Sequence, residues 1–143
     1  MRSATFSPTN AFISAWNPFR HLTAQTGPNQ IETVTLIGDV KNRDVVLIDD
    51  IIDTAGTICS AAELLKDSGA HHILAACTHP ILSGDAVSKL ETSCFLKVFV
   101  TDSIPMEAEK KIDKIEILSS AGLFSEAIKR IHNEESISSL FEF

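Results

Sequence analysis

Residues 45–57 read VVLIDDIIDTAGT, and this stretch decides the fold class. It opens with four apolar, mostly β-branched residues without polar alternation, Val45–Ile48. Such a run is typical of a strand covered on both faces, as in a parallel sheet. From Ile58 the spacing becomes helical, and Gly69 is a good helix stop. One face of this helix collects Ile58, Ala61, Ala62, Leu64 and Leu65. The stretch therefore predicts a strand, a tight loop and a helix.

The loop between this strand and helix combines acids with small residues. Asp49 and Asp50 are expected at the carboxyl end of the strand, where open α/β sheets bind ligands. Gly56 allows a positive φ and a close approach of a ligand to the backbone. The first amides of the helix are unpaired and favour an anion. Paired aspartates alone also occur as solvated strand ends or caps. The full string favours a site in which the acids bind sugar hydroxyls and the loop binds phosphate. The loop consists of Asp53, Thr54, Ala55, Gly56 and Thr57.

Further elements are predicted downstream, in the order β-α-β-α-β-β-α. The expected strands cover 73–77, 96–100 and 115–118, and the expected helices cover 86–91 and 123–132. Alternating strands and helices predict parallel pairing with right-handed crossovers. We therefore expect an α/β fold, a three-layer α/β/α arrangement with a mainly parallel sheet.

Residues 38–58, GDVKNRDVVLIDDIIDTAGTI, resemble the phosphoribosyl diphosphate (PRPP) signature of the type I phosphoribosyltransferase fold, in the form found in ribose-phosphate diphosphokinases. Four more segments resemble that family in the same order: LIGDV at 36–40, ACTHPILSGDAV at 76–87, TDSIP at 101–105 and LFSEAIKRIHNEESISSLF at 123–141. The resemblance implies one phosphoribosyltransferase-like ribose-phosphate-binding domain over residues 34–143.

The family transfers a diphosphoryl group from ATP to ribose 5-phosphate with Mg²⁺, giving PRPP and AMP for nucleotide biosynthesis. The resemblance implies that Asp49 binds the ribose and that residues 53–57 bind its 5-phosphate. It puts Asp50 near the ribose hydroxyls or a hydrated metal. His79 and Ser83 fall in a regulatory loop of the family, and Ser136 and Ser138 match tail positions that help bind regulatory phosphate or nucleotide. A turn histidine and a plain polar tail stay open as the simpler interpretations.

Full family members carry a first half with the ATP-binding residues, the catalytic loop and most magnesium ligands, and no counterpart is found before Leu36. We therefore expect a C-terminal-half fragment that binds ribose 5-phosphate and does not turn over alone, and we assign no catalytic or metal residue. Two alternatives remain. A phosphoribosyltransferase that consumes PRPP leaves the segments at 76–87 and 123–141 unexplained. A non-catalytic, synthetase-associated regulatory subunit tends to have an altered loop, and this loop is intact.

Composition narrows the partners and the compartment. A net charge of −7 without a basic patch argues against nucleic acid. The absence of a long apolar run argues against a membrane span. Three cysteines without metal spacing favour reduced thiols and a cytoplasmic location. A lone half exposes apolar surface, so we expect a homo-oligomer or association with a synthetase subunit.

Residues 1–33 are rich in Ser, Thr, Asn and Pro and carry no acid before Glu32. We expect an irregular N-terminal extension here, with an organellar transit peptide as the weaker alternative. Whether Trp16 and Phe19 dock onto the domain stays open.

Overall fold

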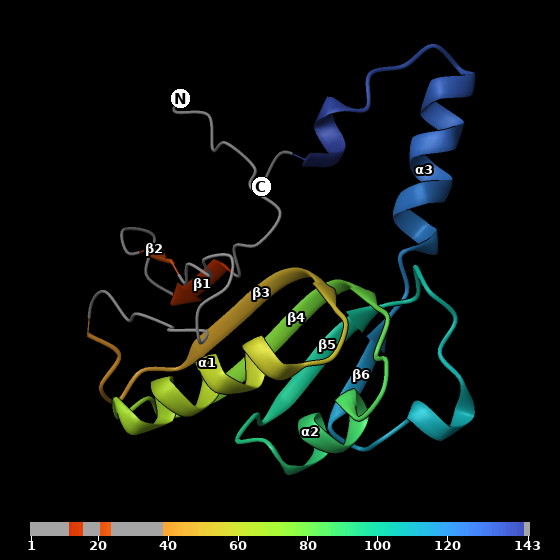
Figure 1. The fold of residues 1–143 in the computed structure, drawn as a ribbon. Coiled ribbons are helices and arrows are strands. Elements are labelled where there is room, and N and C mark those ends of the chain that lie inside the picture. The colour runs from red at the N-terminus through yellow and green to blue at the C-terminus, as the bar shows by residue number, and fades with distance from the viewer. Residues whose placement is uncertain (1–11, 16–20, 24–38, 142–143) are drawn as a thin grey trace, which may run out of the picture.

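The computed structural model describes residues 12–15, 21–23 and 39–141 (Figure 1). Its strands are β1 (Phe12–Ala15), β2 (His21–Thr23), β3 (Val45–Ile52), β4 (Ile73–Pro80), β5 (Lys97–Thr101) and β6 (Ile115–Leu118). Its helices are α1 (Gly56–Asp67), α2 (Ala86–Thr92) and α3 (Ala121–His132), with two short 3-10 helices, η1 (Ala108–Lys110) and η2 (Ser138–Phe141). Within these ranges, no helix has the length and apolar character needed to cross a bilayer.

The strands form one sheet in the order β2-β1-β3-β4-β5-β6. β3, β4, β5 and β6 run parallel, while β1 pairs antiparallel with β3 and β2 pairs antiparallel with β1. The predicted α/β class and mainly parallel sheet are therefore confirmed. β1 and β2 lie within residues 1–33, which were expected to form an irregular extension. No sequence pattern predicted these two strands. The proposed domain boundary at residue 34 stays a prediction, and Trp16 and Phe19 lie outside the described residues.

The core lies between the sheet and the two helices α1 and α2. α1 contacts β3, β4 and α2, and its buried face consists of Ile58, Ala61, Ala62 and Leu65, close to the predicted face. The helix ends where Gly69 takes a φ of 86° and its amide donates to the carbonyl of Lys66 at 2.9 Å. A glycine in the left-handed region is a common helix stop, and this one confirms the sequence prediction.

The described residues leave part of the opposite face of the sheet exposed. Ile48 is 44% exposed there, although Val45 and Leu47 are fully buried against the helices. α3 has no buried residue and extends away from the sheet (Figure 1). Within the described part of the chain, one helical layer covers the sheet. An apolar strand pattern indicates that both faces of the strand are apolar. It does not indicate which segment or partner covers each face.

β3 and β4 are longer than their local sequence patterns. β3 continues past Asp49 and Asp50 to Ile52, and β4 continues past Cys77 to Pro80. The two extensions pair with each other, Ile51 with His79 and Ile52 with Pro80. Because each extension is stabilised by the other strand, a local pattern could not show it.

Candidate functional site

The loop that follows β3 lies at the carboxyl edge of the parallel strands. Asp49 and Asp50 belong to the strand itself, the loop is Asp53–Ala55, and α1 begins at Gly56 rather than near Ile58. The left-handed residue is Ala55, with φ 59° and ψ 5°, and Gly56 has no positive φ. The positive φ that Gly56 would allow is therefore adopted by Ala55 instead.

The left-handed turn at Ala55 has a chemical consequence. The left-handed region costs a non-glycine residue about 1–2 kcal/mol, and Ala55 is held in it while its side chain is 5% exposed. A left-handed residue followed by a helical one turns successive amides toward one concave side, which suits an anion. Within the described residues, no acceptor is found for the amides of Thr54 and Ala55. Gly56 and Thr57 form the first turn of α1, where the helix dipole adds to the attraction.

A second loop, residues 81–85, packs against the loop at residues 53–55 and is hydrogen-bonded to it. Ser83 donates one hydrogen bond from Oγ to the Asp53 carboxylate and another from its amide to the Asp53 carbonyl at 3.0 Å. Lys89 Nζ lies 3.4 Å from the carbonyl of Thr54 and 2.8 Å from Oδ1 of Asp85. Ser83, expected in a regulatory loop, is thus in direct contact with an expected substrate-binding residue. Lys89 could not be predicted from local sequence, because its contact with the Thr54 carbonyl joins residues 35 positions apart.

The two aspartates of β3 differ in environment. Asp49 is half-buried, Asp50 is exposed, and the Asp50 amide donates to Oδ1 of Asp49 at 2.9 Å. Partial burial raises the pKa of the Asp49 carboxyl, and the neighbouring Asp50 carboxyl raises it further. A nearby cation would reduce the repulsion between the two carboxylates. The donor set, carboxylate oxygens, fits Mg²⁺, which keeps several of its waters when it binds to one or two carboxylates.

Hydroxyl groups cross-link the remaining strand ends at this edge. Oγ of Ser103 donates to the Thr78 carbonyl at 2.7 Å and lies 2.9 Å from Nδ1 of His79. Asp102 accepts hydrogen bonds from the Ser119 and Ser120 hydroxyls, both at 2.6 Å. These bonds lower the pKa of Asp102 to about 2. Asp102 and Ser103 were not among the predicted site residues, although their position directly after a buried strand was a usable signal.

The structure does not bring Ser136 and Ser138 to this edge. Both are exposed and lie beyond α3, just before or at the start of η2 (Figure 1). Arg130 organises this tail, because its Nη1 contacts the Ser136 carbonyl at 3.2 Å and Ser139 Oγ at 2.6 Å.

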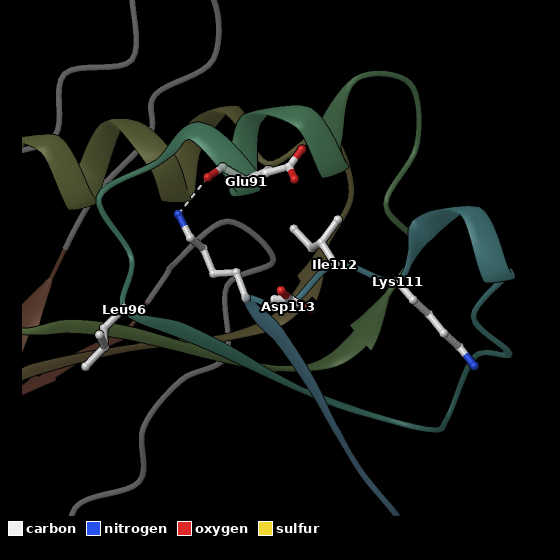
Figure 2. A pocket seen from close by; sticks show the side chains of 6 residues that line it. Glu91, Leu96, Lys111, Ile112 and Asp113 are labelled. Atoms are coloured by element: carbon white, nitrogen blue, oxygen red, sulfur yellow. Dashed lines mark hydrogen bonds between the residues drawn. The ribbon is translucent and has the colours of Figure 1, made fainter.

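A pocket of about 530 Å³ lies at the other edge of the sheet, where β5 and β6 begin (Figure 2). Lys114 Nζ contacts the carbonyls of Glu91 and Ser93, both at 2.7 Å. A lysine that binds the last carbonyls of a helix acts as a cap. We therefore regard the lysine here as part of the end of α2 rather than as a ligand-binding group. The pocket is lined by Glu91, Leu96, Lys111, Ile112, Asp113 and Lys114.

A parallel sheet with an acid-bearing strand, a left-handed turn and a helix N-terminus defines an α/β protein that has a ligand-binding edge at the carboxyl ends of its strands. A family model described as the phosphoribosyl synthetase-associated domain matches residues 3–142, and the chain belongs to that family.

Relatives and a solved structure agree with this family. The chain is 52% identical over 113 residues to a ribose-phosphate pyrophosphokinase of Caldanaerobacter subterraneus, covering 79% of this chain and 36% of that protein. It is 47% identical over 115 residues to the Clostridium acetobutylicum enzyme of the same name, covering 80% and 36%. A phosphoribosylpyrophosphate synthetase structure from Mycobacterium smegmatis superposes with a TM-score of 0.69 at 33% identity, over 73% of this chain and 35% of that one. The chain thus spans about a third of the proteins it matches, their C-terminal third.

Proposed function

We propose that this chain provides the ribose 5-phosphate site of a ribose-phosphate diphosphokinase. The amides around the left-handed Ala55 and the first turn of α1 bind the 5-phosphate, together with the hydroxyls of Thr54 and Thr57. Asp49 binds the ribose, and Asp50 lies near the ribose hydroxyls or would hold a hydrated Mg²⁺. The observation that carries this proposal is the left-handed turn at Ala55, together with the amides of Thr54 and Ala55, for which the described residues provide no acceptor.

The reaction of the whole enzyme would join the diphosphoryl group of ATP to the anomeric hydroxyl of ribose 5-phosphate, releasing AMP. Transfer of this kind depends on cations that neutralise the developing charge. Lys89, the lysine that contacts the phosphate loop in the described residues, is already bonded to Asp85 and to the Thr54 carbonyl. We therefore propose that the chain positions the sugar phosphate, does not turn over alone, and depends on an ATP site supplied from elsewhere.

Calorimetric titration tests the binding step. Ribose 5-phosphate should bind with one site per chain, while ribose without phosphate should bind far more weakly. Asp53→Ala removes the carboxylate that accepts from Ser83 and should weaken binding of ribose 5-phosphate. Binding of ribose as strong as that of ribose 5-phosphate would refute the assignment of the loop to phosphate.

Turnover is tested separately by AMP formation from ATP, Mg²⁺ and ribose 5-phosphate. The pure chain should form none above background. Robust turnover would overturn the proposed dependence on another ATP site, but not the sugar-phosphate site. Base-dependent consumption of PRPP would instead favour a phosphoribosyltransferase.

A second candidate is a regulatory subunit that associates with a synthetase. It is favoured by the apolar side chains that α3 exposes, among them Phe124 at 60% and Ile128 at 66%. Co-purification of this chain with a separately expressed full-length synthetase tests it. Either candidate suits a reducing, cytoplasmic compartment, because Cys77 is a buried free thiol and its pKa is raised by burial to about 11.

A further inference from the structure

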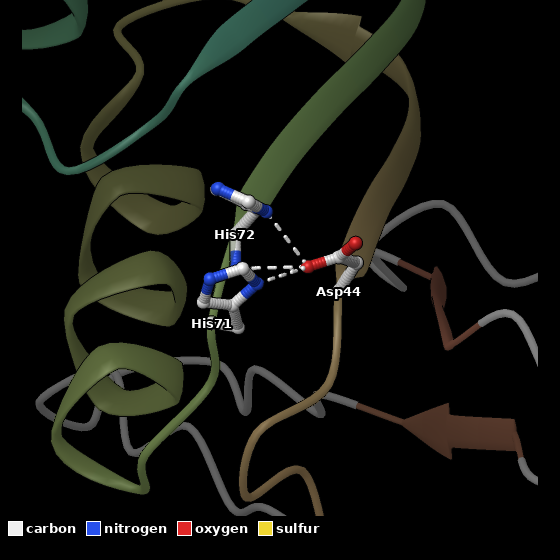
Figure 3. A group of neighbouring side chains, drawn as sticks. All are labelled: Asp44, His71 and His72. Carbon is white, nitrogen blue, oxygen red and sulfur yellow. Dashed lines mark hydrogen bonds and ion pairs between the residues drawn. The ribbon is translucent and has the colours of Figure 1, made fainter.

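Two histidines and one aspartate converge at the amino ends of β3 and β4 (Figure 3). Asp44 immediately precedes β3, and His71 and His72 immediately precede β4. Nδ1 of each histidine lies 2.9 Å from the same oxygen, Oδ1 of Asp44. This cluster is at the edge of the sheet opposite the phosphate loop. Within the described residues, it is the one group of three such side chains whose ligand atoms lie within 4.8 Å of one another.

The sheet holds the backbone of this cluster in place. The His71 amide donates to the Arg43 carbonyl and the Val45 amide donates to the His72 carbonyl, both at 2.8 Å. The His72 amide also donates to Oδ1 of Asp44 at 3.2 Å. His71 and His72 are 27 and 28 positions from Asp44 in the sequence. The first hydrogen bonds of the β3–β4 pairing therefore fix their backbones relative to Asp44. Only the side chains need to move to bind a ligand.

The donor set is chemically selective. Two imidazole nitrogens and one carboxylate oxygen match the ligands of Zn²⁺, at about 2.0–2.2 Å from the ion. Tetrahedral ligands at that range lie roughly 3.4 Å apart, so the 2.9 Å contacts must open by about half an ångström. Exposed side chains can do this, and these are 44–62% exposed. The same exposure leaves a fourth position for water.

The two rings are close enough to share one ion, since the ring centroids of His71 and His72 lie 3.7 Å apart. A metal ion needs neutral imidazoles and satisfies both of them together with the carboxylate. Nitrogen donors favour zinc, nickel and copper over Mg²⁺.

We propose that Asp44, His71 and His72 form a surface site for a divalent transition-metal ion of the Zn²⁺ class. Bound metal joins the starts of β3 and β4, and thereby closes the β3–α1–β4 unit at the end away from the phosphate loop. The site is independent of the proposed sugar-phosphate function, because no group in it belongs to that loop.

Calorimetric titration of the full chain with Zn²⁺, without any histidine tag, tests the proposal. One equivalent should bind and raise the melting temperature, and Mg²⁺ should have no such effect. His71→Gln and His72→Gln should each weaken binding at least about tenfold. His132→Gln, which alters an exposed histidine at the end of α3, is the matched control and should bind like the unmodified chain.

Two further readouts keep the test decisive. Co²⁺ should give absorption typical of nitrogen and oxygen ligands without a thiolate band, since any thiolate band would assign the metal to cysteine and overturn the proposal. If a variant does not fold, NMR of the unmodified chain decides, because Zn²⁺ must shift the His71 and His72 imidazole signals before any others. Absence of binding, or equal binding by the folded glutamine variants, would also overturn it.

Discussion

Replacing Gly56 by alanine should stabilise the fold and weaken ligand binding at the same time. Gly56 is the first residue of α1, and its φ is not in the left-handed region. A Cβ added there meets Thr54 Oγ1 at 3.9 Å, which is an ordinary contact. The protein itself therefore has room for the methyl group, and only a ligand that approaches the Gly56 backbone closely would be displaced by it.

The two effects have opposite signs and different sizes. Alanine at a compatible glycine position reduces the freedom of the unfolded chain and adds about 0.4–1 kcal/mol to the free energy of unfolding. Loss of one hydrogen bond to a charged phosphate oxygen costs about 1.5–3 kcal/mol of binding, which raises the Kd roughly 10- to 100-fold. Gly56→Val should weaken binding further, because a branched side chain crowds the amides more.

Gly122→Ala is the matched control. Gly122 is the second residue of α3, and a Cβ there meets no atom within 4 Å. Both alanine variants should therefore raise the melting temperature, but only Gly56→Ala should weaken binding of ribose 5-phosphate in calorimetry. Unchanged affinity in a stabilised Gly56→Ala protein would refute the idea that the phosphate lies against this backbone.

Three other outcomes follow from the structure. The Asp102 pKa is lowered from 3.8 to about 2 by hydrogen bonds from Ser119 and Ser120, so its stabilising contribution is present above pH 3.8 and is lost as the pH falls toward 2. In thermal melts, the gap between the native protein and Asp102→Asn should close over that interval, and a gap independent of pH would contradict the assignment. Cys77 has a pKa raised by burial to about 11, so at pH 8 only about one thiol in a thousand is ionised and alkylation should be far slower than in denaturant. The exposed apolar side chains of α3 should drive association, so light scattering should detect a dimer or larger species that Ile128→Glu dissociates, and a monodisperse native monomer would argue against an interface there.

Local sequence was sufficient for most elements of the domain. The helical period and Gly69 predicted α1 and its end, and the apolar runs predicted β3 to β6, because both signals depend on neighbouring residues alone. The acids and small residues of 49–57 likewise marked the loop before its conformation was known. What local sequence could not give was the identity of the strained residue, since any of several residues in a tight turn can carry the positive φ and packing selects Ala55.

The contacts between distant segments were also beyond local reasoning. Ser83 with Asp53 joins residues 30 positions apart, and no pattern within either loop indicates the other. Local sequence also gave no sign of the contacts that Asp102 makes with Ser119 and Ser120, or of those that the two histidines make with Asp44. Each of these side chains lies in a segment that looks like an ordinary polar turn.

The sequence by itself determined the α/β class, the family and the position of the loop at residues 53–57, because periodicity and short motifs are properties of consecutive residues. Only the tertiary structure decided which residue of that loop is left-handed, which side chains contact the loop, and which side chains meet at the opposite edge. The physical reason is that parallel strands bring together residues far apart in the chain, and their register is set by the hydrogen bonds and packing of the whole sheet.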